Sequence, residues 1–191
     1  MGFQAPRFRR FLGDSKGAAA AEFVLWLGLL IIPMASAVDV GIYAFQKMQV
    51  EMASQAAVQA AWKACDTAGK LPATKTATNC GADLTTTITT AAQSTSLGTG
   101  VTIASGSPVE GYYCTAADNT LQLVGATGVI GSPPTKPSPF TCATVVAGST
   151  IAPGDYLQVT VSYSYAPVFS GVSIAELLTT PITKTAWTRL G

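Results

Sequence analysis

The chain has 191 residues, enough for one compact domain with additional segments, and only 11% of them are charged while 48% are hydrophobic. Soluble domains usually have about a quarter of their residues charged, so this composition favours a membrane-associated or exported protein. Residues 1–17 hold four bases and one acid, whereas from Val40 onward seven bases balance seven acids, and the chain has no His. These features argue against nucleic acid as a partner and against most hydrolase and metalloenzyme mechanisms. We therefore expect no enzyme activity, no cofactor and no metal.

The first predicted element is a membrane-spanning helix. Residues Phe23–Val38 carry no charge, and Ala18–Ala21 extend the apolar run, interrupted only by Glu22. The run has about 20 residues, or about 30 Å of helix, which matches the thickness of a bilayer core. Pro33 lies inside it and is expected to kink the helix or to remove one hydrogen bond.

The charges on either side predict the orientation of this helix. Because basic residues stay in the cytoplasm, residues 1–17 are expected to be a cytoplasmic leader and residues 18–38 to span an inner membrane. Asp39 is then the first charge on the periplasmic or extracellular side and should mark the bilayer edge. An alternative is a secretory signal peptide cleaved after Ala37, because Ala35-Ser36-Ala37 has the A-x-A pattern. We favour the anchor, because the leader is long and the helical pattern continues past that cut.

Residues 39–66 are predicted to extend the same helix beyond the membrane. Good helix formers reach as far as Ala64, which gives one helix about 70 Å long from Ala18. Lys47 and Glu51 have the i,i+4 spacing of an ion pair. A stripe of apolar residues is expected to pack against the protein's own head, the alternative being a dedicated partner seam. The stripe contains Ile42, Phe45, Met48, Met52, Ala56 and Ala60.

Residues 67–191 are predicted to form a disulfide-linked head. The four Cys residues all follow the apolar segment, and an even number in an exported region suggests two disulfides. We favour Cys65–Cys80 and Cys114–Cys142, since these pairs close the shortest loops consistent with local folding. A zinc site or free thiols are the alternatives, but the sequence has no C-x-x-C.

Within the head, residues 82–96 are predicted to form a second helix, and short strands follow. The clearest strand is Asp155–Tyr165, in which apolar and polar residues alternate. Gly131–Pro139 contains four Pro and is expected to be a surface loop. The apolar residues Val168, Phe169 and Ile174–Leu178 are expected to be buried, although exposure would mark an interface. The other predicted strands are 101–104, 112–114, 121–124, 140–146 and 183–190. The fold class is therefore predicted to be α+β, with a long N-terminal transmembrane helix packed against a small antiparallel sheet. Among the acidic residues, no carboxylate pair stands out as an acid–base couple.

The stretch Lys16–Phe23, KGAAAAEF, resembles the processing site of type IV prepilins. The resemblance implies cleavage between Gly17 and Ala18 and makes Glu22 the fifth residue of the mature chain. Phe23 stands where flp-type pilins tend to have an aromatic residue. A lone carboxylate at the start of a membrane helix is costly unless paired, so Glu22 is expected to neutralise the amine of Ala18 on a neighbouring subunit. The alternative is that Glu22 only favours the N-terminus of the helix through the macrodipole.

The wider stretch from Arg9 to Ala61 resembles the TadE/TadG-like family of tight-adherence pilus proteins. The features that match are the basic start, the G-A-A-A-A-E-F segment, the apolar run, the sequence Val40-Gly41-Ile42-Tyr43 and the Ala/Gln-rich helix. The resemblance implies a minor pilin or pseudopilin of a type IV-like pilus, with a pilin-like fold and a role in cell adhesion. Its implied partners are the inner membrane, other pilin-like subunits, the pilus secretion machinery and a prepilin peptidase. The alternative function is an exported adhesin or envelope binding module anchored by one helix.

Overall fold

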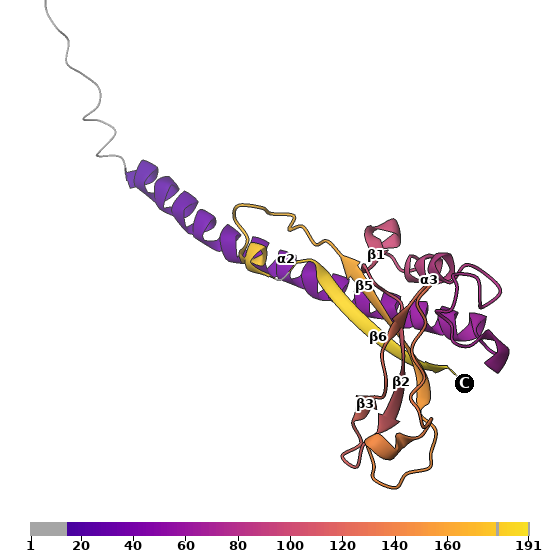
Figure 1. Cartoon of the computed structure of the whole chain (residues 1–191). Coiled ribbons are helices and arrows are strands. Elements are labelled where there is room, and N and C mark those ends of the chain that lie inside the picture. Colours follow the sequence, from indigo (N-terminus) through magenta and orange to yellow (C-terminus); the bar gives the residue numbers. More distant parts are fainter. Residues whose placement is uncertain (1–14, 179, 191) are drawn as a thin grey trace, which may run out of the picture. The chain divides into compact units, whose positions relative to one another are not determined.

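The structure is a computed structural model that describes residues 15–178 and 180–190. The chain divides into two compact units. The first unit contains Met1–Tyr43 and Ala166–Leu178, and the second contains Ala44–Tyr165 and Thr179–Gly191. The predicted α+β fold class is confirmed, since the structure has one long N-terminal helix and a six-stranded antiparallel sheet (Figure 1).

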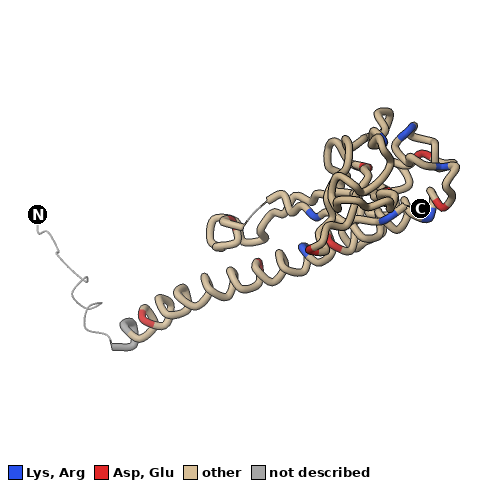
Figure 2. Tube along the Cα trace, turned by 60° about the horizontal axis from the view of Figure 1, so that its bottom comes forward, with Lys and Arg blue, Asp and Glu red and all other residues tan. Residues whose placement is uncertain are grey.

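The long helix α2 runs from Ser15 to Ala64 and so contributes to both units. It begins three residues earlier than predicted and continues through Pro33. Residues 19–34 are exposed on all sides of the helix, among them the apolar Leu25, Leu30 and Met34. A helix that is apolar all round suits a lipid environment. In the described part of the chain, one helix, within Ala19–Ala64, is long and apolar enough to cross a membrane. Figure 2 shows how few charges the described N-terminal half of α2 carries.

The sheet of the second unit is built around the long strand β5, Gly154–Tyr163. Strand β6, Ile182–Leu190, pairs along one edge of β5, and the other edge pairs first with β2, Val109–Thr115, and then with β1, Val101–Ile103. The outer edge of β2 pairs with the short strands β3, Leu121–Leu123, and β4, Gly128–Val129. The alternation predicted for β5 holds: Leu157, Val159 and Val161 are fully buried.

The face of α2 that packs in the second unit consists of small residues. Its fully buried positions include Val50, Ala53, Ala57 and Ala61. These residues have the spacing i, i+3, i+7 and i+11, which places them on one face of a helix. In Figure 1 the strands β5 and β6 cross this part of the helix. The predicted stripe was therefore wrong for its large residues, since Phe45, Met48 and Met52 are exposed. Its other members, Ile42, Ala56 and Ala60, are half-buried. The buried face of α2 is therefore made mainly of small side chains, whereas these large Phe and Met side chains lie outside it.

The ion pair expected between Lys47 and Glu51 is also replaced. Glu51 instead pairs with Lys184 on β6, with 2.7 Å between Nζ and Oε2. The Lys184 ammonium holds the pKa of Glu51 below its ordinary value, and Lys47 contributes only a weaker charge effect. The pair links helix to sheet at the surface, where such contacts contribute little to stability.

One short helix and several 3-10 turns complete the two units. Helix α3, Leu84–Ala92, lies within the predicted helix and is capped by Asp83, whose side chain accepts a hydrogen bond from the Thr86 N–H. Short 3-10 turns occur at Ala68–Lys70 (η1), Gly98–Gly100 (η2), Cys142–Thr144 (η3) and Ile174–Leu177 (η4). The strand predicted over 140–146 was wrong, because Cys142 is disulfide-bonded to Cys114 and its carbonyl accepts from both Val145 and Val146, which curls the chain.

Candidate functional site

The predicted processing site lies at the beginning of α2. Gly17 and Ala18 are in its first turn, where the structure describes the backbone but not the surroundings of these two residues. Glu22 and Phe23 are exposed, and Phe23 leaves 66% of its surface uncovered. Residues 18 and 22 are four positions apart and therefore share one face of the helix. The structure thus presents the residues predicted for subunit assembly on the surface of the helix, where another chain can reach them.

Asp39 lies one turn beyond Ser36 and is completely buried. Its two carboxylate oxygens accept hydrogen bonds from the N–H groups of Val168 and Phe169, at 3.0 and 3.1 Å. Ser36 is also buried, and its Oγ accepts from the N–H of Ile174 at 3.4 Å. Hydrogen bonds to a charged acceptor are stronger than neutral ones. Asp39 therefore fastens the segment Ala166–Leu178, here called the clamp, to the helix.

The four Cys residues form the two disulfides favoured from loop length. Cys65 pairs with Cys80 at the end of α2, and Cys114 on β2 pairs with Cys142. All four are buried, and Cys114 and Cys142 form a small core with Val124. Their role in the described structure is to hold the loops of the head in place.

A buried pair of carboxyl groups lies inside the second unit, although the sequence had shown no such couple. Glu110 on β2 is fully buried and accepts three hydrogen bonds: from the N–H groups of Ala73 and Thr74, both at 2.7 Å, and from the Thr74 hydroxyl at 2.5 Å. Asp155 on β5 is 8% exposed, and its Oδ1 has no hydrogen-bond partner. Burial, and then the charge of Glu110, raise the pKa of Asp155 to about 8. The acid is therefore protonated at neutral pH.

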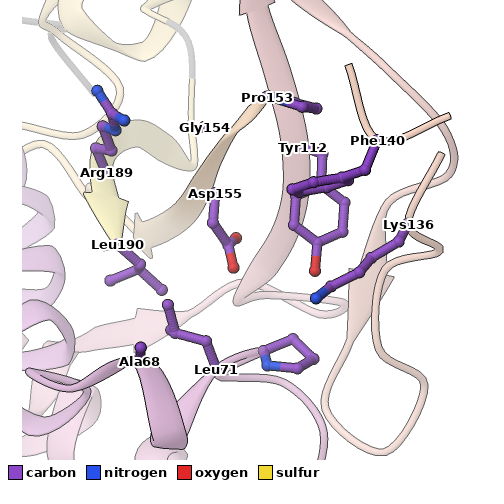
Figure 3. A pocket seen from close by; sticks show the side chains of 11 residues that line it. Ala68, Leu71, Tyr112, Lys136, Phe140, Pro153, Gly154, Asp155, Arg189 and Leu190 are labelled. Atoms are coloured by element: carbon purple, nitrogen blue, oxygen red, sulfur yellow. The ribbon is translucent and has the colours of Figure 1, made fainter. Parts of the chain in front are cut away.

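Asp155 borders a pocket of about 260 Å³. Figure 3 shows its carboxyl, the Tyr112 hydroxyl and the Lys136 amine turned toward the middle of this pocket. The Lys136 amine lies 5.4 Å from the centre of the Phe140 ring, and this ring meets Tyr112 edge to face. Burial, with the charges of Asp155 and Glu110, raises the pKa of Tyr112 to about 12. The sequence could not reveal this group, because it depends on the register that places Tyr112 opposite Asp155.

Taken together, these features define a class: α+β proteins with one apolar helix exposed for a membrane and a disulfide-linked antiparallel head. Residues 17–59 match the family model described as TadE-like protein, so the predicted resemblance is confirmed for this segment. The match includes Gly17, Glu22, Phe23 and Asp39 and most of the buried face of α2, but none of the sheet. Neither a curated protein nor a solved structure matches the chain.

Proposed function

We propose that this protein is a membrane-anchored minor pilin or pseudopilin that takes part in assembly of a tight-adherence, type IV-like pilus. The observation that carries the proposal is the TadE-like match over residues 17–59, because it coincides with the exposed apolar helix. Family membership of this kind points to involvement in such a pilus system. The finer role, a structural subunit rather than an enzyme or an adhesin, is our inference.

Glu22 supports a structural role. It is the first charged residue of α2 whose side chain the structure describes, this side chain is exposed, and the apolar residues Phe23 and Val24 follow it directly. A carboxylate beside lipid is costly unless it is paired. After cleavage behind Gly17, the new amine of Ala18 on a neighbouring subunit would supply that pair and would fix the axial register between the two helices.

The disulfides support the proposed location. Disulfides persist in oxidising compartments such as the bacterial periplasm, and both lie in the second unit. We therefore place the N-terminus in the cytoplasm, α2 across the inner membrane and the head on the periplasmic side. The partners would be other pilin-like subunits, the secretion machinery and a prepilin peptidase.

Complementation of a deletion strain tests this function. The gene is deleted in the native host and restored as wild type, as Glu22→Gln, or as Asp118→Asn, and sheared pili are quantified by electron microscopy and immunoblotting. Asp118 is a matched control, since its exposed carboxylate serves only a turn between β2 and β3. We expect wild type and Asp118→Asn to restore pili and Glu22→Gln to reduce them several-fold.

Two results would separate the parts of the proposal. A deletion strain that keeps normal pili but loses adhesion would contradict the assembly role and favour the adhesin alternative. Full restoration by Glu22→Gln, with pili lost in the deletion strain, would leave the assembly role in place and remove the proposed pairing of Glu22.

A further inference from the structure

The clamp has an unusual distribution of side chains. The residues of the clamp that face inward are the small Ser173 and Ala175, which are buried, as is Ala35 on the helix. Its large apolar residues face outward, and Leu177 leaves 88% of its surface exposed. The exposed set is Val168, Phe169, Val172, Ile174 and Leu177. A water-soluble loop has the opposite arrangement, and a contiguous apolar surface of this kind marks an interaction site.

The backbone of the clamp is largely satisfied by internal partners. Besides the bonds to Asp39 and Ser36, the N–H groups of Val172 and Ser173 donate to the Phe169 carbonyl, at 3.2 and 3.0 Å. The Ala175 N–H donates to Ser173 Oγ, and Leu178 donates to the Ala175 carbonyl. Irregular backbone enters a water-poor region only when its polar groups find such partners.

The only charge of the clamp is Glu176, and it is partly compensated. Its carboxylate accepts a short hydrogen bond from the Gly171 N–H, and the side chain remains exposed. The thirteen residues from Ala166 to Leu178 contain no base. One exposed carboxylate among five apolar side chains suits the boundary between headgroups and acyl chains, where polar groups reach water and apolar groups do not.

The position of the clamp identifies its partner. It is fastened at Ser36 and Asp39, at the end of the uncharged stretch Phe23–Val38. Three residues of helix separate these two attachment points, about 4.5 Å along the axis, so Ile174 is held on the membrane side of Asp39. The neighbouring helix residues Met34 and Val38 are themselves exposed and apolar. The clamp thus holds its exposed apolar side chains at the end of the candidate membrane span.

We propose that the clamp inserts its apolar side chains into the bilayer, in the leaflet on the Asp39 side, and that it forms a second part of the membrane anchor. This rests on the proposed membrane anchoring of α2. Asp39 then acts as an internal fastener: it satisfies two backbone donors of the clamp and has its own charge compensated at the edge of the lipid.

Spin-label accessibility of the full chain in phosphatidylcholine–phosphatidylglycerol nanodiscs tests the proposal. Single Cys substitutions are labelled with a nitroxide at Leu177 in the clamp, at Leu29 in the span, and at the exposed Thr90 in α3. The native Cys residues are paired in disulfides and do not compete for the label. Collision rates are measured with oxygen, which concentrates in lipid, and with a water-soluble nickel chelate.

We expect the label at Leu177 to resemble that at Leu29, with oxygen collisions several-fold more frequent than nickel collisions. The order should reverse at Thr90. A nickel-accessible label at Leu177, with Leu29 still in lipid, would overturn the proposal and place the clamp in water. A label at Leu177 that neither reagent reaches would overturn it in favour of a protein partner, such as a second copy. Nickel access at Leu29 would overturn the anchoring itself.

Discussion

At the residue scale, Asp155 has a free-energy cost that depends on pH. Its carboxyl is buried beside Glu110, and its pKa rises from an ordinary value near 3.8 to about 8. Between these values the unfolded chain loses this proton while the folded chain keeps it. The free energy of unfolding therefore falls as pH rises through this window, by at most about 1.4 kcal/mol per pH unit for one proton.

The substitution Asp155→Asn tests this cost. An amide has nearly the shape of the protonated acid and cannot ionise, so the variant should lose the decline in stability between pH 4 and 8 and exceed wild type at pH 8. Thermal melting of the detergent-solubilised chain, followed by near-ultraviolet circular dichroism at several pH values, measures this. Parallel pH profiles of the two proteins would contradict a protonated Asp155.

Asp39 provides a second prediction at this scale. The substitution Asp39→Ala removes the acceptor for the N–H groups of Val168 and Phe169. Hydrogen bonds to a charged group are worth about 1.5–3 kcal/mol each, so losing both should raise the exchange rate of these two amides at least about tenfold. Hydrogen–deuterium exchange with mass spectrometry measures the change. The control Asp118→Ala, which removes an exposed turn acceptor in the other unit, should leave the exchange rates of these two amides unaltered. If the Val168 and Phe169 amides are as protected in Asp39→Ala as in wild type, other contacts hold the clamp.

At the scale of elements, α2 shows that small size, rather than hydrophobicity, selects the face that packs. Ala57 is fully buried in the second unit, whereas Met52 is more than half exposed. Substituting Ala57 by Leu adds volume to a filled contact and should destabilise the head by about 1–3 kcal/mol. The matched change Met52→Leu should alter stability by less than about 0.5 kcal/mol. Chemical or thermal unfolding measures the change in stability of both variants. An Ala57→Leu variant as stable as wild type would contradict tight packing at this position.

The elements also differ in how far the sequence predicts them. The long apolar helix α2 and the strand β5 were predictable, because a long uncharged run favours one long helix and a strict alternation favours a half-buried strand. The segment 140–146 was not, because a short apolar run does not determine its own conformation and the bond of Cys142 to Cys114 bends it. The clamp was wrongly expected in the core, because Val168 and Leu177 belong to no periodic pattern that would distinguish exposed from buried positions.

The residues of the candidate site also divide into those that local sequence predicts and those that depend on the tertiary fold. Gly17, Glu22 and Phe23 belong to one contiguous motif, so their place on the exposed helix could be predicted. The pairing of Glu110 with Asp155 joins residues 45 positions apart and depends on the register of β2 with β5. Local sequence carries information about helices and membrane spans, but a buried polar group is defined only when strands have paired.

At the scale of the whole molecule, the proposed role as a pilin-like subunit requires processing, whereas an uncleaved chain would serve as an anchor. Cleavage between Gly17 and Ala18 would remove the basic leader, with its four bases and one acid, and would create an α-amine four residues before Glu22. The protease needs access to the backbone at a residue without a side chain. A bulky residue at position 17 should therefore block cleavage and leave Met1 or Gly2 as the N-terminus.

Intact-mass spectrometry of the membrane-extracted protein tests this with Gly17→Leu and the control Gly28→Leu. Gly28 lies in the same apolar helix, and a Cβ there would meet no atom within 4 Å, so its substitution preserves the fold and the hydrophobic length. Wild type and Gly28→Leu should both begin at Ala18, whereas Gly17→Leu should retain its leader and support fewer pili. A wild-type chain that keeps its first 17 residues in cells with normal pili would show that this protein serves the pilus as an uncleaved anchor, and that Glu22 has no terminal amine to pair with.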